Sequence, residues 1–288
     1  MSTVIIPGKH GDIIQMLPAL EKLSKKQCAP VTVAAVEPYL QTLEGASYVK
    51  PERLGGDWKK AAVEGRRIHP EAVIPQFWLD PMSDELMSHS FKNPVVASFR
   101  GKGLYIDGDK FPDYGTAMWV KMGYKKEDML KGRPKFDQRD ADRERALVDF
   151  FRLNGKPSIV MALESESSPF GWVPELVNAL NQRFRDTVRF INIHRFRCVR
   201  IFDMLGLLDA ADGLITADSA LFHLAAASKK PWIGLRAPGW SGSIARNACM
   251  SLVYPEVPVH MEQILEMVTK MCSGELLKNA PTRVKGTP

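Results

Sequence analysis

The stretch PGKHGDIIQMLPAL, Pro7 to Leu20, puts a lysine, a histidine and an aspartate between Gly8 and Ile13, directly after a short apolar run. Glycines that permit tight turns, next to charged side chains, are typical of ligand-binding loops that follow a strand. The loop contains neither the Walker phosphate-binding pattern nor the dinucleotide fingerprint. Asp12 begins an amphipathic helix pattern, where aspartate is also a common helix cap. The residues therefore fit either an active-site loop or a capped helix.

A second stretch with similar potential is ADGLITADSALFHLAAASKKPWIGL, residues 211–235. An apolar strand pattern leads to Asp218 and Ser219 at the start of a helix, where free backbone N–H groups and the helix dipole favour anions. His223 lies four residues after Ser219, so both side chains share one helix face. This pattern predicts an anion-binding site, but a capped helix with an incidental histidine explains it as well.

The composition is that of a globular protein and favours anionic partners. The 288 residues include 39 Lys and Arg against 33 Asp and Glu, a formal charge of +6 that suits phosphates, nucleotides or nucleic acid, or simply reflects a slightly basic surface. The four cysteines are isolated, and no CxxC pair or histidine cluster indicates zinc or a disulfide framework. No apolar run approaches the ~20 residues of a membrane span, and the start MSTVIIPG lacks a signal-peptide pattern. We therefore expect a cytoplasmic protein without a metal site.

Apolar runs alternate with helical patterns along the chain. Expected strands cover residues 3–7, 31–36, 72–75, 94–99, 158–163, 187–193, 213–216 and 231–235. This order predicts an α/β protein with parallel sheets that are covered on both faces. The polar segment KGRPKFDQRD interrupts the alternation, so we expect two Rossmann-like domains that face each other. The predicted divisions are a first domain at 1–133, a linker and connecting helix at 134–156, and a second domain at 157–288, whose last helix (261–272) could pack back on the first.

Ligands of such sheets bind outside the carboxyl ends of the strands, which is where both stretches lie. Together, HGDIIQMLPALEKL, the following VTVAAVEPYLQTLEGASYV and the later DSALFHLAAASKKPWIGL resemble glycosyltransferase family nine, the ADP-heptose:lipopolysaccharide heptosyltransferase family. The resemblance covers both halves in order and is weakest between residues 53 and 133. It implies the GT-B fold, in which two Rossmann-like domains face each other across a cleft that holds the site.

The resemblance also implies a role for each matching residue. Asp12 would be the general base that takes the proton of the acceptor hydroxyl. The loop around it would face an anionic substrate through Gly8, Lys9, His10 and Gly11. The nucleotide and diphosphate of the donor would be held by Asp218, Ser219, Ala220 and His223. The implied reaction is an inverting transfer of a sugar from a nucleotide-diphosphate sugar, with no cofactor and no required metal.

The chain departs from the family pattern around the donor phosphates. Ala220 stands where the family has a glycine, and Gly171 stands where it has a lysine or arginine before Trp172, which is kept as a donor-site candidate. Glu164 and Glu166 add negative charge nearby. Hydroxyl groups could still donate hydrogen bonds to phosphate from Ser165, Ser167 and Ser168. A replacement cation could come from the segment INIHRFRCVR, from His194, Arg195 or Arg197, although these side chains could equally line a solvated face.

The acceptor is less defined than the donor. An anionic, lipid-linked lipopolysaccharide-type glycan at the inner face of a membrane would suit the basic residues of the first half, among them Arg66, Arg67, Arg100 and Lys102. DNA with hydroxymethylated bases, as in phage-type glycosyltransferases, would suit residues 183–200, RFRDTVRFINIHRFRCVR, because arginines and phenylalanines can track phosphates and stack on bases.

A catalytically inactive nucleotide-binding module is a third alternative. The substituted glycine and the missing lysine favour it, whereas the retained Asp12 opposes it, because a protein that only binds has little use for a base. A dehydrogenase is disfavoured because the dinucleotide fingerprint is absent. The residues leave the donor sugar, its nucleotide and the oligomeric state open.

Overall fold

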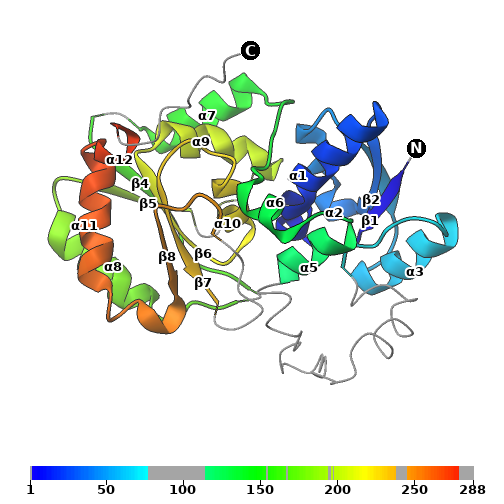
Figure 1. The fold of residues 1–288 in the computed structure, drawn as a ribbon. Helices are drawn as coiled ribbons and strands as arrows, with labels where there is room; N and C mark the ends of the chain where they lie inside the picture. Colours follow the sequence, from blue (N-terminus) through cyan, green and yellow to red (C-terminus); the bar gives the residue numbers. More distant parts are fainter. Residues whose placement is uncertain are drawn as a thin grey trace, which may run out of the picture.

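The computed structural model describes residues 2–76, 114–153, 155–166, 168–193, 196, 198–237 and 245–278. Within these ranges the chain forms two parallel sheets, one in each half of the sequence, with helices on their faces (Figure 1). The predicted α/β class with two parallel sheets is therefore confirmed. The strand expected at 94–99 lies outside the described residues.

The first sheet contains three parallel strands in the order β1 (Thr3–Ile6), β2 (Val31–Val36) and β3 (Val49–Leu54). Val73 forms an isolated parallel bridge to Val4, so the strand expected at 72–75 is reduced to this bridge. The helices of this half are α1 (His10–Gln27), α2 (Glu37–Leu40), α3 (Trp58–Ile68), α5 (Tyr114–Lys121) and α6 (Lys126–Lys131). Only Pro7, Gly8 and Lys9 separate β1 from α1, so the end of β1 fixes where this loop and the first turn of α1, with Gly11 and Asp12, lie.

Strand β3 is not apparent from the sequence, because its segment VKPERL contains a proline and three charged residues. Pro51 pairs with Val33 of the central strand β2. Proline is tolerated here because β3 ends the described sheet, and its other side needs no ladder hydrogen bonds. Only the two ends of the strand, Val49 and Leu54, are buried, which hides it from a hydrophobicity pattern.

The second sheet contains five parallel strands in the order β5-β4-β6-β7-β8. Their bounds are β4 (Ser158–Ala162), β5 (Arg189–Asn192), β6 (Gly213–Ala217), β7 (Trp232–Arg236) and β8 (Met250–Val253). The chain adds β5 on one side of β4 and then returns to add β6 on the other. The carboxyl ends of β4 and β6 therefore flank the switch point where sheets of this topology bind ligands.

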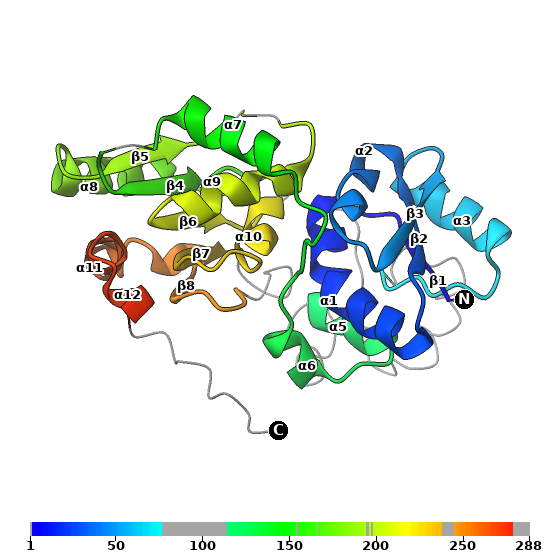
Figure 2. The ribbon, with the colours of Figure 1, turned by 90° about the horizontal axis from the view of Figure 1, so that it is seen from above.

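Helices cover both faces of the second sheet (Figure 2). One face carries α8 (Val173–Phe184) and α11 (Met261–Cys272), with α12 (Glu275–Lys278) beside α11. The opposite face carries α9 (Met204–Ala210) and α10 (Ala220–Ala225). α7 (Ala141–Phe151), in the predicted connecting segment, packs against α9. The apolar residues of α11 belong to the core of the second half.

One apolar core continues from the first half into the second. Its buried members include Leu17 of α1 and Phe222 of α10. Phe136, which follows α6, stacks on Phe202 of the second half with ring centroids 5.4 Å apart. α1 lies beside α10 in both views (Figures 1 and 2). The two halves therefore meet along these helices, which begin at the two stretches that the sequence singles out.

Candidate active site

The loop after β1 is held by its own backbone and by one buried side chain. The N–H of Gly8 donates to Gln76 Oε1 at 3.0 Å, and the N–H of Lys9 donates to Asp12 Oδ2 at 2.9 Å. A Cβ atom on Gly8 would collide with the Asp12 carboxylate and the Gln76 amide. Lys9 therefore holds the N-cap position that the sequence suggests for Asp12, and Asp12 caps α1 from the third helical position by accepting from the N–H of Lys9. These contacts hold the Asp12 carboxylate beside Gly8. Gln76 carries no local sequence signal that could have identified it.

His10 is neutral at pH 7. Burial lowers its pKa from 6.5 to about 4. Its Nδ1 lies 2.7 Å from Thr42 Oγ1, and its ring packs edge-on against Tyr39 with centroids 4.8 Å apart. A neutral imidazole can bind a substrate through a hydrogen bond, but it offers no positive charge to an anion.

Lys9 crosses from the first half to the second. Its Nζ lies 3.6 Å from Glu166 Oε2 in the loop after β4, and the two side chains are 60% and 88% exposed. Exposed ion pairs of this kind contribute little to stability. The pair nevertheless shows that the loop after β1 and the loop after β4 face each other.

The loop after β4 is tied to the end of β6 by hydrogen bonds. Ser165 Oγ donates to the carbonyl oxygen of Asp218 at 2.6 Å and accepts from the N–H of Ser168 at 3.2 Å. Tyr254 joins the same network, because its hydroxyl donates to the carbonyl of Ser168 at 2.8 Å and accepts from the N–H of Asp218 at 3.1 Å. The hydroxyl proton of Ser165 is thus used within the protein, so Ser165 acts here as a support of the loop. The pairing of Tyr254 with Ser168 spans 86 residues and has no sequence signature.

Ser219 precedes α10 with an extended backbone, at φ −146°. Its Oγ is buried and has no hydrogen-bond partner among the described residues. α10 has only six residues, from Ala220 to Ala225, so the dipole that the sequence suggests is short. The hydroxyl of Ser219, rather than the helix end, is the polar group that this loop leaves available.

His223 is a packing residue in this structure. It is 7% exposed, and burial together with the positive charge of Arg246 lowers its pKa to about 3. A Cβ atom on Gly11 would lie 2.9 Å from His223 Cδ2. The absence of a side chain at Gly11 therefore permits α1 and α10 to approach each other.

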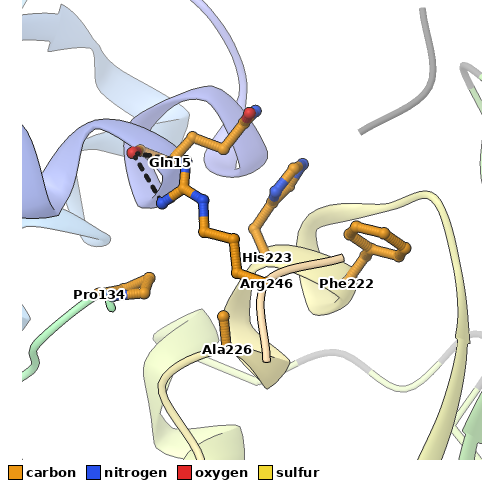
Figure 3. Close-up of a pocket in the computed structure, with 6 residues that line it drawn as sticks. All are labelled: Gln15, Pro134, Phe222, His223, Ala226 and Arg246. Atoms are coloured by element: carbon orange, nitrogen blue, oxygen red, sulfur yellow. Dashed lines mark hydrogen bonds between the residues drawn. The ribbon is translucent and has the colours of Figure 1, made fainter. Parts of the chain in front are cut away.

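Two further residues that the sequence did not indicate lie beside this contact, and one of them, Arg246, joins the two halves. The indole Nε1 of Trp119, on α5, donates to the carbonyl of Gln15 at 3.1 Å. Both terminal nitrogens of Arg246 lie 3.5 Å from the same oxygen, and its guanidinium lies 5.4 Å from the Trp119 ring centroid. Figure 3 shows Arg246 reaching from the second half to Gln15, with His223 beside it.

A cavity of about 10 Å³ lies at this contact, lined by Gln15, Pro134, Phe222, His223, Ala226 and Arg246 (Figure 3). That volume holds about one water molecule, and none of a sugar or nucleotide. The cavity is therefore part of the interface between the halves.

Other predicted site residues are less informative. Ala220 begins α10 and Trp172 is 38% exposed next to the start of α8. A Cβ built on Gly171 meets no atom of the described chain within 4 Å. The remaining predicted donor-site residues lie outside the described ranges: Ser167, His194, Arg195 and Arg197.

The basic residues proposed for the acceptor side are only partly placed. Arg66 donates from one nitrogen to the carbonyls of Pro70 and Ala72, at 2.6 and 2.7 Å, and so secures the end of α3. Arg67 lies in the last turn of the same helix, whereas Arg100 and Lys102 lie outside the described residues. In the part of the chain that the structure describes, no group of three or more His, Cys, Asp or Glu could hold a metal ion. None of the described helices is long and apolar enough to cross a membrane.

Comparisons with known proteins agree with this architecture. Residues 199–245 match the model of Glycosyltransferase family 9 (heptosyltransferase). A comparison with curated protein sequences finds no match. Among solved structures, the E. coli ADP-heptose lps heptosyltransferase II has a TM-score of 0.63 and 15% identity, covering 96% of this chain and 100% of its own.

Two further structures show the same fold. The glycosyl transferase family 9 protein from Veillonella parvula has a TM-score of 0.57 and 12% identity, covering 96% of this chain and 98% of its own. The E. coli heptosyltransferase WaaC with ADP has a TM-score of 0.53 and 14% identity, covering 95% of this chain and 99% of its own. The chain thus has the GT-B fold, and its segment 199–245 resembles glycosyltransferase family 9.

Proposed function

We propose that this protein is a glycosyltransferase that moves a sugar from a nucleotide-diphosphate sugar to an acceptor hydroxyl, with Asp12 as the general base. The observation that carries the proposal is the contact between Gly11, next to Asp12, and His223, in the segment that matches the family model. Residues more than two hundred positions apart are brought together at the carboxyl edges of both sheets. This is the arrangement that a transfer between two substrates requires.

In the proposed reaction the donor lies at the switch point between β4 and β6. The acceptor hydroxyl gives its proton to Asp12 and attacks the anomeric carbon of the sugar, and the bond from that carbon to the diphosphate oxygen breaks. The nucleoside diphosphate leaves with the bonding electron pair. Attack from the face opposite the leaving group inverts the anomeric centre, as the family resemblance implies, and a required metal is not part of the proposal.

The rate of sugar transfer would depend on how well the protein stabilises the negative charge that develops on the departing diphosphate. Hydrogen-bond donors that are already oriented toward developing negative charge stabilise a transition state without reorganisation. Ser219 supports this role because its Oγ is buried without a partner among the described residues. Ser165 and Tyr254 hold the backbone of the two loops in place through the network around Asp218.

We place a lipopolysaccharide-type glycan first among acceptors. The solved structures of similar fold include one described as an ADP-heptose lps heptosyltransferase, and the basic chain suits an anionic glycan. The DNA alternative loses part of its support. Phe184 is 7% exposed and packs with Phe190 in the core of the second half, and Phe196 packs against Phe150 and Phe151, so these rings are engaged.

The proposal is tested by measuring binding of ADP, GDP, CDP and UDP to the full chain by calorimetry, followed by the matching nucleotide sugars. We expect one nucleoside diphosphate to bind, and to raise thermal stability by about 3 kcal/mol at a hundred times its dissociation constant. Binding of none of the four would overturn the donor assignment. Donor binding without turnover on glycan or DNA acceptors would support the inactive module instead.

A further inference from the structure

Arg236 is the last residue of β7, and its side chain has no hydrogen-bond or ion-pair partner among the described residues. It is half-buried, and its Nε is fully covered with no hydrogen-bond partner among the described residues. No ion pair to Arg236 is found within the described part of the chain. Buried charges in proteins are normally paired, because losing water without a replacement partner is costly. A half-buried guanidinium whose Nε is covered and has no partner in the described residues therefore favours an anion that these residues do not supply.

The sheet register places Arg236 beside the proposed donor loop. Leu235 pairs with Ala217 in the parallel ladder between β7 and β6, so Arg236 and Asp218 follow at the same edge. Side chains two positions apart in a strand share one face, so Arg236 lies on the same face of β7 as Trp232 and Gly234. That face packs on α10, because the ring of Phe222 lies 5.1 Å from the Trp232 centroid and 3.0 Å from a Cβ built on Gly234.

Arg236 therefore leaves the sheet on the side of α10, at the edge where Ser219 precedes that helix. The Oγ of Ser219 and the Nε of Arg236 are both buried without hydrogen-bond partners in the described ranges. Two unsatisfied polar groups, one a cation and one a neutral hydroxyl, at the same edge of one sheet favour the same kind of ligand.

Three other cations of the described chain have partners elsewhere. Arg246 reaches the carbonyl of Gln15 in the other half. Arg200 forms a short pair with Asp203, with nitrogen and oxygen 2.6 Å apart. Lys9 lies 3.6 Å from Glu166.

We propose that Arg236 binds the diphosphate group of the donor, with the Ser219 hydroxyl as a second donor to the same phosphates. The inference rests on the proposed function and adds a specific residue to it. A guanidinium suits this role because its planar N–H groups can bind two phosphate oxygens at once. Arg236 then supplies the positive charge that Gly171 does not.

The test measures the affinity of Arg236→Gln and Arg236→Lys for whichever of ADP, GDP, CDP or UDP binds the wild type, and for the matching nucleoside. Loss of a hydrogen bond to a charged group predicts a 10- to 100-fold weaker diphosphate Kd for Arg236→Gln. The nucleoside Kd should change less than threefold, and Arg236→Lys should recover part of the loss. Arg183→Gln, on the exposed side of α8, is the matched control and should bind like the wild type.

A second measurement separates binding from folding. Because Arg236 is unpaired without ligand, Arg236→Met should unfold at the same temperature as the wild type or at a higher one. A lower unfolding temperature would mark Arg236 as a structural residue and overturn the proposal. An unchanged diphosphate Kd in Arg236→Gln would also overturn it while leaving the proposed function intact. Failure of the wild type to bind any of the four diphosphates would overturn both.

Discussion

The contact between the two halves at Gly11 predicts that Gly11→Ala lowers the free energy of unfolding when residue 223 is histidine, but not when it is alanine. In the wild type, a Cβ atom on residue 11 would lie 2.9 Å from His223 Cδ2, where ordinary contacts begin at 3.4 Å. The ring of His223 is 7% exposed and cannot swing into solvent. Gly11→Ala must therefore push α1 from α10, or the ring out of place, by roughly 0.5 Å, in a region packed at the density of a protein interior.

The magnitude follows from two opposing terms. Overpacking of a well-packed site costs about 1–3 kcal/mol. Alanine is favoured over glycine in a helix by up to about 1 kcal/mol, partly because the unfolded chain loses freedom. We therefore expect Gly11→Ala to lower the free energy of unfolding by about 1–2 kcal/mol in the wild type. In a His223→Ala background the clash is gone, and the same change should be neutral or stabilising by up to about 1 kcal/mol.

Urea unfolding of the four proteins of this double-mutant cycle measures the coupling. The midpoints and slopes give the free energy of unfolding for each variant, and unchanged slopes show that the variants unfold in the same way. The expected coupling between positions 11 and 223 is about 1–3 kcal/mol. Gly171→Ala is the control, because a Cβ atom there meets nothing within 4 Å and should cost nothing.

Equal losses from Gly11→Ala in both backgrounds would refute the reasoning. That result would mean that α1 and α10 do not meet through this pair, and the placement of Asp12 opposite the second half would lose its support.

Three further predictions follow from the site. Burial lowers the pKa of His10 from 6.5 to about 4, so between these pH values the unfolded chain binds a proton that the folded chain does not. The free energy of unfolding should therefore drop by on the order of 3 kcal/mol as the pH falls from 6.5 to 4. In urea unfolding, His10→Gln should lack this loss, whereas the control His260→Gln should keep it. Gly8→Ala should lose about 1–3 kcal/mol in urea unfolding, because its Cβ collides with Asp12 and Gln76, and a neutral result would contradict that contact. Trp119→Phe keeps most of the ring but loses the donor to Gln15, so it should cost about 1 kcal/mol, and a loss below the error of the midpoints would show that this hydrogen bond is not formed.

The alternation of apolar runs and helical patterns predicts most of the second half. The helix expected at residues 261–272 has those bounds in the structure, because its apolar residues recur at helical spacing and face the core. β3 could not be predicted in the same way, since Pro51 and its charged neighbours are permitted by its place at the end of a sheet. Position within a sheet is set by tertiary structure and leaves no local pattern.

The candidate site, too, could be predicted only in part. Glycine and polar residues that follow strands identify the two loops, because turns at strand ends require particular residue types in the local sequence. The residues that join the loops to the rest of the fold have no such local sequence signal. Tyr254 reaches Ser168 and Arg246 reaches Gln15 across 231 positions, and only the folded chain brings these pairs together. Arg236 looks from the sequence like the end of an apolar strand, and only its missing partners in the described structure draw attention to it.

The role of Asp12 is tested most directly by turnover in Asp12→Asn. With the nucleotide sugar that binds the wild type, release of nucleoside diphosphate in the presence of glycan acceptors is measured for wild type, Asp12→Asn and the control Asp142→Asn, which changes an exposed aspartate in the first turn of α7. Loss of a general base predicts a kcat about 10²- to 10⁴-fold lower in Asp12→Asn, with the diphosphate Kd unchanged and Asp142→Asn fully active. A kcat for Asp12→Asn close to that of the wild type would contradict the account, because Asp12 would then only cap α1.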